Sequence, residues 1–254
     1  MPRSELFPSD WLVPGERHED RGVLKTGKEA DVHLVARHGG GRTVLLAEKR
    51  FRPRERRGFR HDWAYRAPAE YTVRRGVDGV GPRREQRAMR KAVGFGREMI
   101  QARWIATEWE NLVHLYAAGV TVPPPVELLD DGYRMAFIGD GEQAAPRLAE
   151  VDLDIATARH VWGELLEELR MVVAADRVHG DLSAYNVLWW RERPVLIDLS
   201  QTVDVITHPA ARELLDRDLH ALARYFVRHG VEVDRTRALA AVGADAHRFA
   251  RQVS

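Results

Sequence analysis

Hydrophobic and polar residues alternate with a period of two in several short stretches of the first part of the chain, which is typical of β-strands. The alternation predicts four strands, arranged as two hairpins, at residues 32–36, 44–51, 126–129 and 134–138. Glycines 39–41 are expected to form the first hairpin turn, and Asp131-Gly132 the second. Residues 1–20 contain two prolines and are expected to be irregular or partly helical.

Apolar residues recur at helical spacing elsewhere, mainly in the second part of the chain. This spacing predicts helices at residues 98–117, 155–175, 210–229 and 235–250. Gly119 and the following Val-Pro-Pro-Pro segment are expected to end the first helix. Strands with one helix, followed mostly by helices, predict an α+β protein with two lobes, at residues 1–138 and 139–254. Residues 50–97 are polar and rich in Arg, so we expect a basic, mobile insertion there.

Composition narrows the functional classes. The 254 residues are 44% hydrophobic and 30% charged, which is ordinary for a globular protein. The chain contains no cysteine, so disulfides and thiolate metal sites are excluded. No apolar run of about 18 residues occurs, and the first 20 residues lack the apolar stretch of a secretory signal. We therefore expect a cytoplasmic protein with no membrane contact.

The candidate chemistry is concentrated in two short stretches, H-G-D-L-S-A-Y-N-V-L-W-W at 179–190 and V-L-I-D-L-S-Q at 195–201. Transfer of a phosphoryl group from ATP requires a carboxylate to orient the attacking hydroxyl and hard oxygen ligands for Mg²⁺. Asp181 supplies such a carboxylate, and Asn186 a neutral oxygen ligand five residues later. Asp198 follows an apolar strand and supplies a charged metal ligand. These three residues are the predicted catalytic centre, with Asn186 and Asp198 as metal ligands.

The spacing D-x-x-x-x-N, followed by a strand that ends in Asp, resembles eukaryotic-type protein kinases and the related aminoglycoside and choline kinases. Two stretches narrow the resemblance, because D-L-S-A-Y-N (181–186) and L-I-D-L-S-Q (196–201) are similar to D-L-S-E-Y-N and I-D-x-S-Q of the RIO kinase family. The similarity covers roughly residues 20–229, although Ala184 replaces the usual Glu and residues 60–98 match poorly. It implies a two-lobed, protein-kinase-like fold with a small β-rich N-lobe and a truncated, mostly helical C-lobe.

The upstream stretch G-V-L-K-T-G-K-E-A-D-V (22–32) resembles the phosphate loop of the same family, S-T-G-K-E-A-x-V. It also nearly fits a Walker A loop, but Glu29 stands where that motif needs Ser or Thr, and a strand rather than a helix follows. The resemblance implies that Thr26, Gly27, Lys28 and Glu29 surround the ATP phosphates.

The stretch A-E-K at 47–49 resembles the third strand of kinases, where a small residue covers the adenine and a lysine reaches the α- and β-phosphates. Ala47 and Lys49 share one strand face, and an inward lysine has few structural explanations. Such a lysine needs a carboxylate partner. Glu108 matches the E-x-x-N-L pattern of the family, with Glu98 and Glu110 as alternatives.

The segment Met135–Gly139 resembles the hinge strand of kinases. The resemblance implies that the backbone of Phe137 and Ile138 binds the adenine edge. Further along, Asp218 resembles the family aspartate that binds the backbone of the catalytic loop or His179, which is a structural role.

These resemblances imply an ATP-dependent serine/threonine-type kinase that uses Mg²⁺, or Mn²⁺ in its place. They also imply an ATPase cycle through an acyl-phosphate on Asp198, so kinase and ATPase activity both stay open. A small-molecule kinase of the aminoglycoside or choline type is a second hypothesis. A third is a ribosome- or RNA-associated nucleotide-binding module that contacts RNA phosphates through the Arg-rich stretches 50–60 and 83–97. The sequence does not identify the phosphate acceptor.

Overall fold

The computed structural model describes residues 17–52 and 95–243, with side chains from residue 102 onward in the second range. Most of the expected basic insertion, residues 53–94, lies outside the described residues. Its expected ends are corrected, because Arg50 and Phe51 belong to a strand and a helix already begins at Phe95. The strand extends to Phe51 because its end is paired on both sides: Phe51 with Ala30 on one side, and Arg50 with Gly132 on the other.

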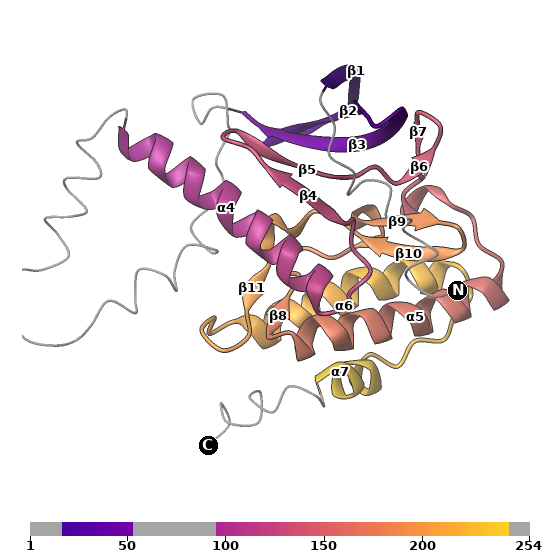
Figure 1. Ribbon diagram of the computed structural model, residues 1–254. Helices are drawn as coiled ribbons and strands as arrows, with labels where there is room; N and C mark the ends of the chain where they lie inside the picture. The colour runs from indigo at the N-terminus through magenta and orange to yellow at the C-terminus, as the bar shows by residue number, and fades with distance from the viewer. Residues whose placement is uncertain (1–16, 53–94, 244–254) are drawn as a thin grey trace, which may run out of the picture.

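Five antiparallel strands form the sheet of the N-lobe, in the order β1-β2-β3-β5-β4 (Figure 1). Their bounds are β1 Arg17–Thr26, β2 Ala30–Gly39, β3 Arg42–Phe51, β4 Pro125–Leu128 and β5 Gly132–Ala136. The four strands predicted from alternation are confirmed: β2 and β3 are longer than expected, whereas β4 and β5 keep the expected length but lie one and two residues earlier. Gly40 and Gly41 have φ values of 57° and 75°, which explains why glycines make the β2–β3 turn.

Strand β1 corrects the prediction of an irregular or partly helical segment up to residue 20. Most of its residues are polar and exposed, and its apolar residues Val23 and Leu24 are adjacent, so no alternation marks it as a strand. Pairing with β2 and charged contacts hold it instead. The Asp20 carboxylate lies 3.0 Å from His33 Nδ1 and 2.7 Å from Arg50 Nη1. A strand that depends on its neighbours in this way is not visible in its own sequence pattern.

Helix α4 (Phe95–Ala117) packs against the sheet and lies between it and the helices below (Figure 1). Ile105, Leu112 and Leu115 are buried on its inner side, as the helical spacing requires. The helix stops before Gly119, whose φ of 92° favours glycine, and the prolines at 123–125 prevent its continuation. The expected helix at 98–117 is therefore confirmed, with an earlier start.

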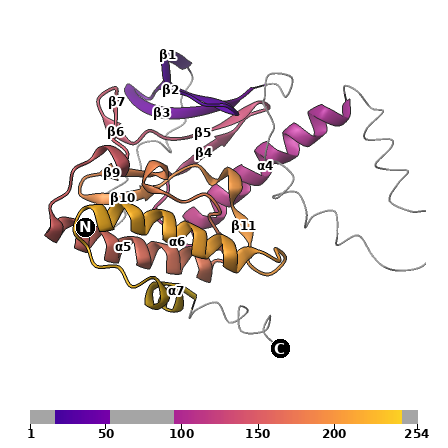
Figure 2. The same ribbon diagram turned by 180° about the vertical axis from the view of Figure 1, so that it is seen from behind.

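In its described residues, 139–243, the C-lobe consists of three helices and short two-stranded ladders. The helices are α5 (Ile155–Ala174), α6 (Ala211–Arg228) and α7 (Arg235–Gly243), and the chain also contains short 3₁₀ turns, η3 (Leu148–Glu150), η4 (Ala184–Asn186) and η5 (Leu199–Gln201). The ladders pair β6 (Gly139–Asp140) with β7 (Gln143–Ala144), β9 (Val187–Trp190) with β10 (Arg193–Leu196), and β8 (Arg177–Val178) with β11 (Val203–Asp204). Helices α5 and α6 lie side by side beneath the β9–β10 ladder in both views (Figures 1 and 2). The predicted α+β fold is confirmed.

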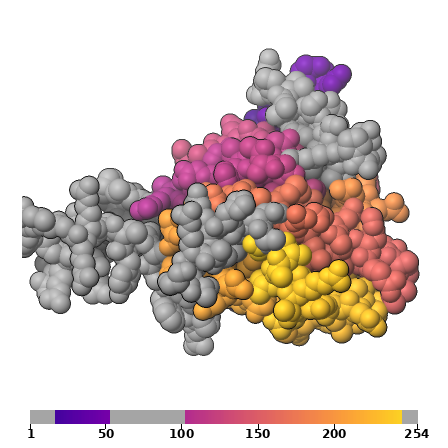
Figure 3. Space-filling model, turned by 90° about the horizontal axis from the view of Figure 1, so that it is seen from below, coloured from indigo at the N-terminus to yellow at the C-terminus, as the bar shows by residue number. Residues whose placement is uncertain are grey.

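The core continues from the N-lobe into the C-lobe. One cluster of buried residues joins Phe51, Leu112 and Tyr133 of the N-lobe to Leu165 and Phe226 of the C-lobe helices. Seen from below, α7 lies across the outer face of the C-lobe next to α5 (Figure 3). The last expected helix begins at residue 235 as predicted, and residues 244–250 of it lie outside the described part. None of the helices in the described residues is long and apolar enough to span a bilayer.

Candidate active site

Lys49, on the inner face of β3, is buried and lies between two carboxylates. Its Nζ atom donates to Glu108 Oε1 at 2.5 Å and to Asp198 Oδ1 at 3.0 Å. Glu108 comes from α4 and is 1% exposed, whereas Asp198 follows β10 of the C-lobe. A single ammonium group thus connects three elements that are far apart in the sequence. Of the three carboxylates considered as partners, Glu108 is the one that pairs; Glu110 is exposed, and the side chain of Glu98 lies outside the described residues.

Tyr133 completes this buried cluster, and nothing in the sequence pointed to it. It stands directly opposite Lys49 in the β3–β5 register, and its hydroxyl donates to Glu108 Oε1 at 3.0 Å. Glu108 therefore receives one charged and one neutral hydrogen bond on the same oxygen. Buried carboxylates need such partners, because an unpaired buried charge is costly. The signal that could have identified Tyr133 is the pairing of β3 with β5, which places it across from Lys49.

The charges of this cluster shift one another's pKa values. Burial alone would lower the pKa of Lys49, but Glu108, Tyr133 and Asp198 together raise it well above its ordinary value. Burial raises the pKa of Glu108, and Lys49 opposes that effect. Lys49 lowers the pKa of Asp198, against the effect of partial burial. Lys49 and Asp198 are therefore charged at neutral pH, as binding to phosphate and to a metal ion requires.

Asp198 sits at a sharp change of backbone direction between β10 and η5. Its φ of 65° and ψ of 71° lie in the left-handed region, which is uncommon for a residue other than glycine. Non-glycine residues in this region persist where the surroundings hold them, often at functional sites. Here the preceding residue is held by a bond from the Ile197 amide to the Asn186 carbonyl, at 3.0 Å. The turn directs the Asp198 carboxylate toward Lys49.

The hydrogen bond from the Ile197 amide to the Asn186 carbonyl also connects the Asp198 turn to the loop that carries the other two predicted catalytic residues. The Asn186 Nδ2 atom donates to the Asp181 carbonyl oxygen at 2.7 Å and lies 3.4 Å from Asp181 Oδ2. Asn186 is buried, whereas Asp181 is exposed. Partial burial of the carboxyl group raises the pKa of Asp181, and His179 opposes that shift. The structure therefore brings Asp181, Asn186 and Asp198 into one connected group.

Helix α6 supports this loop from below. Asp218 accepts hydrogen bonds from the Gly180 amide at 2.7 Å and from the Leu182 amide at 2.9 Å. Burial raises the pKa of Asp218 to about 6, against the effect of His179 and of these two amides. The expected bond between Asp218 and the catalytic-loop backbone is present. His179 bonds through Nε2 to the Ile197 carbonyl at 3.1 Å, next to Asp198.

The predicted phosphate loop is the short connection between β1 and β2. The Gly27 amide donates to the Ala30 carbonyl at 3.0 Å, and a Cβ atom at Gly27 would lie 2.7 Å from that carbonyl oxygen. Glycine is therefore required for this turn. Thr26 and Lys28 are exposed, Glu29 is half-buried, and the Glu29 carbonyl accepts from the Arg52 amide at the end of β3. The loop thus lies at the end of the sheet where Lys49 is found.

The predicted hinge, Met135–Gly139, covers the last two residues of β5 and the three residues that follow it. The Phe137 amide donates to the Leu45 carbonyl at 3.3 Å, and the Ile138 carbonyl accepts from the Ala145 amide at 2.9 Å. Ala47 is buried and pairs with Met135 in the β3–β5 register. Ala47 and this segment thus belong to the same region of the sheet.

The donors at Asn186 and Asp198 fit a magnesium ion. Because Asn186 Nδ2 is engaged by the Asp181 carbonyl, the Oδ1 atom is the part of the amide left for a cation. Asp198 adds a partly exposed, ionised carboxylate. Among the described residues no group of three or more His, Cys, Asp or Glu could hold a metal by itself. Two protein ligands are nevertheless typical of Mg²⁺ sites that are completed by substrate phosphates and water.

Comparison of the sequence with known proteins identifies the family of this chain. A sequence model of the RIO domain matches residues 81–239, more than half of the chain. The chain belongs to the RIO family. The RIO-type serine/threonine-protein kinase Rio1 of Thermoplasma acidophilum is 35% identical over 131 residues, which cover 52% of this chain and 67% of that protein. Rio1 of Haloferax volcanii is 32% identical over 213 residues, 84% of this chain and 65% of that protein. Human serine/threonine-protein kinase RIO1 is 29% identical over 243 residues, 94% of this chain but 38% of the human protein.

The predicted family is thus confirmed, and the kinase class expected from the sequence agrees with the names of these relatives. Glu108, Asp181, Asn186 and Asp198 all lie within the part that matches the RIO domain. The alignment with human RIO1 also includes the N-terminal strands and Lys49, because it covers 94% of the chain.

Proposed function

We propose that this RIO-family chain is an ATP-dependent phosphotransferase that acts on serine or threonine hydroxyls of a protein, on water as an ATPase, or on both. The observation that carries the proposal is the Lys49 ammonium, which bridges Glu108 of the N-lobe and Asp198 of the C-lobe. A buried cation beside a metal-binding carboxylate is what a nucleotide triphosphate with its Mg²⁺ requires. The names of the relatives, serine/threonine-protein kinases, support a protein hydroxyl as the acceptor.

In this proposal Lys49 binds the α- and β-phosphates, and Glu108 holds the Lys49 side chain in place. The phosphate loop contributes Thr26, Gly27, Lys28 and Glu29, and the adenine contacts are Ala47, Phe137 and Ile138. The exposed position of Lys28 and the tight turn at Gly27 support this assignment, because glycine lets backbone amides approach phosphate closely.

Asn186 and Asp198 would hold Mg²⁺, or Mn²⁺ in its place, which when bound neutralises charge on the phosphates. Asp181 orients the attacking hydroxyl or water and accepts its proton. Its exposure supports this role, because an acceptor has to reach its carboxylate from solvent. The hydrogen bonds from Asn186 keep Asp181 at a fixed place relative to the metal ligands.

The alternative hypotheses gain less support. Of the Arg-rich stretch 50–60, Arg50 and Arg52 are described, and both pair with carboxylates of the sheet: Arg50 with Asp20 and Glu48, Arg52 with Asp31. The rest of that stretch, and residues 83–94, lie outside the described part. An RNA-associated role therefore stays a prediction, as does a small-molecule kinase.

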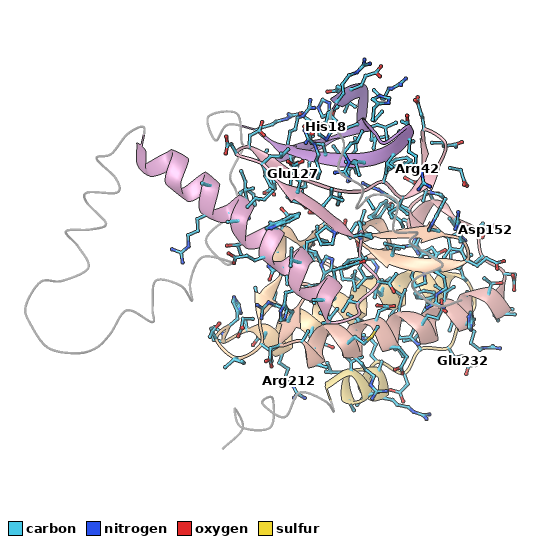
Figure 4. The ribbon with its side chains drawn as sticks, viewed as in Figure 1. His18, Arg42, Glu127, Asp152, Arg212 and Glu232 are labelled. Atoms are coloured by element: carbon cyan, nitrogen blue, oxygen red, sulfur yellow. The ribbon has the colours of Figure 1, made fainter. Side chains whose placement is uncertain are left out.

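Incubation with γ-labelled ATP and Mg²⁺, followed by mapping of the labelled residues, tests the proposal. We expect Mg²⁺-dependent release or transfer of the label, which is lost in Asp198→Ala. Asp152→Ala is a matched control, because Asp152 is exposed, lies at the edge of the C-lobe before α5 and pairs with His229 (Figure 4). Label on serine or threonine supports the kinase, label on Asp198 the acyl-phosphate cycle, and label in free phosphate alone an ATPase. Wild-type protein that neither transfers nor releases label would contradict the proposal.

A further inference from the structure

The backbone on both sides of Asp181 is held more tightly than a surface loop usually is. Gly180 has a φ of 80°, and a Cβ atom there would collide with the Gln201 carbonyl oxygen. The loop therefore passes directly against the turn that follows Asp198, and no side chain fits at position 180. Glycine is required here, but glycine also has the widest range of backbone conformations. External contacts are needed to keep its peptide groups in one orientation.

Two consecutive residues of α6 provide these contacts. Asp218 accepts from the Gly180 amide and from the Leu182 amide through its two carboxylate oxygens. An Arg217 guanidinium nitrogen donates to the Gly180 carbonyl oxygen. The Gly180 amide, the Gly180 carbonyl and the Leu182 amide belong to three successive peptide groups. Asp218 thus holds the first and third of them, and Arg217 holds the second.

The middle peptide group is the one that joins Gly180 to Asp181. The orientations of the peptide groups before and after a residue fix its φ and ψ, and therefore the direction of its side chain. The peptide group after Asp181 is held by Asp218 at its amide and by Asn186 at its carbonyl, whereas the carbonyl of the one before it is held by Arg217. We propose that Arg217 is a positioning residue that directs the Asp181 carboxylate by holding the carbonyl of Gly180.

Asp218 and Arg217 have the side-chain chemistry that these contacts need: an acceptor for amides and a donor for a carbonyl. Asp218 is 1% exposed, and its acceptor oxygens take the two amide hydrogens. Arg217 lies at an exposed position, and its long side chain with a planar fork of N–H donors can reach the carbonyl from the helix surface. Residues 179–190 contain no Lys or Arg, so α6 also supplies a guanidinium that this loop lacks. Because the two residues are adjacent on one helix, their relative position is fixed.

The test separates catalysis from binding and from folding. In Arg217→Ala, turnover of ATP should fall at least about tenfold, because a small displacement of a catalytic group costs up to about 100-fold in rate. The KM for ATP and the midpoint of thermal unfolding should stay near those of the wild type, because Lys49 and the core are unchanged. Arg217→Lys can still donate to the Gly180 carbonyl and should recover most of the turnover.

Arg235→Ala is the matched control, because Arg235 of α7 pairs at 2.8 Å with Asp216, the neighbour of Arg217 in α6, rather than with the loop. It should leave all three quantities unchanged. Hydrogen exchange at the Leu182 amide gives a readout besides activity, and we expect it to be faster in Arg217→Ala.

The inference rests on the proposed function, but the two can fail separately. Inactive wild-type protein contradicts the proposed function. Active wild type with full turnover in Arg217→Ala overturns the inference, and so does an Arg217→Ala variant whose turnover, KM and unfolding midpoint all worsen together, since that shows a general structural role.

Discussion

Lys49 is the cation that pairs with a carboxylate of each lobe, Glu108 in the N-lobe and Asp198 in the C-lobe. Replacement by alanine would remove the proposed charge-assisted contact to phosphate, worth roughly 1.5 kcal/mol or more, so turnover of ATP should fall at least about tenfold. It also leaves Glu108 as a buried carboxylate with no cation. Breaking a buried pair in this way typically costs about 3–5 kcal/mol. Urea unfolding and an ATP turnover assay of Lys49→Ala measure the two losses.

The double variant Lys49→Ala/Glu108→Gln separates these effects. The new amide side chain in place of Glu108 would be neutral and could still accept from the Tyr133 hydroxyl. The double variant should therefore recover much of the free energy of unfolding but none of the turnover. Recovery of turnover would show that Lys49 does not bind phosphate.

The ring of Tyr133 packs in the core, and its hydroxyl is the part that bonds to Glu108. In Tyr133→Phe, Glu108 loses one of its two partners, and the free energy of unfolding should fall by about 1–3 kcal/mol. The affinity for ATP should also fall, because the Glu108 carboxylate that holds Lys49 is less firmly fixed. Tyr225→Phe is the matched control: its hydroxyl donates to the Val151 carbonyl at 2.8 Å, away from this cluster. We expect Tyr225→Phe to lower stability without any change in ATP binding, measured by calorimetry. Equal ATP affinity in both variants would argue against a functional role for Tyr133.

These residues also show which members of the candidate site can be predicted from the sequence alone. Asp181, Asn186 and Asp198 were predictable because they lie within one short stretch, where spacing along the chain determines spacing in the fold. Glu108 could only be named with two alternatives, since the rotation of a helix about its axis depends on what it packs against. Tyr133 required the register of β3 against β5, two strands that the whole of α4 separates in the sequence.

At the scale of elements, helices were predictable and the first strand was not. The bounds of α5 and α6 agree with the prediction to within a residue or two, because each carries its apolar stripe in its own sequence. Strand β1 lacks such a pattern and is defined by pairing with β2.

A buried carboxylate adds a polar connection between helix α5 and the N-lobe. Glu168 accepts from the Thr121 amide at 2.7 Å and from the Thr121 hydroxyl at 2.5 Å, while the Thr121 carbonyl accepts from Leu196 of β10. Glu168→Ala leaves the buried Thr121 amide unsatisfied, so we expect a loss of about 2–4 kcal/mol in the free energy of unfolding. Glu168→Gln keeps one acceptor oxygen and should lose less. Chemical denaturation measures both.

Glu167→Ala provides the comparison on the same helix. Glu167 is exposed and pairs with Arg170 at 3.2 Å, a contact worth less than about 0.5 kcal/mol. If Glu168→Ala were no less stable than Glu167→Ala, the bond to Thr121 would have no part in joining α5 to the N-lobe.

For the whole molecule, the proposed function makes nucleotide binding a contact that joins the lobes. Lys49 and the phosphate loop belong to the N-lobe, and Asn186 and Asp198 to the C-lobe, so ATP with Mg²⁺ would bridge both. A ligand that binds the folded state stabilises it by about 2.7 kcal/mol at 100 times its Kd. For a chain of this size that corresponds to roughly 5–10 °C in the unfolding midpoint.

This stabilisation should consist of a part that needs the metal and a part that does not. With ATP and EDTA, wild-type protein keeps the contacts of Lys49 and the phosphate loop, so its midpoint should rise less than with ATP and Mg²⁺. In Asp198→Ala the charged metal ligand is absent while Lys49 keeps Glu108 as its partner. Its midpoint with ATP should therefore be the same with Mg²⁺ as with EDTA. A full Mg²⁺-dependent rise in Asp198→Ala would show that the metal is held elsewhere, and that the bridge between the lobes does not pass through this carboxylate.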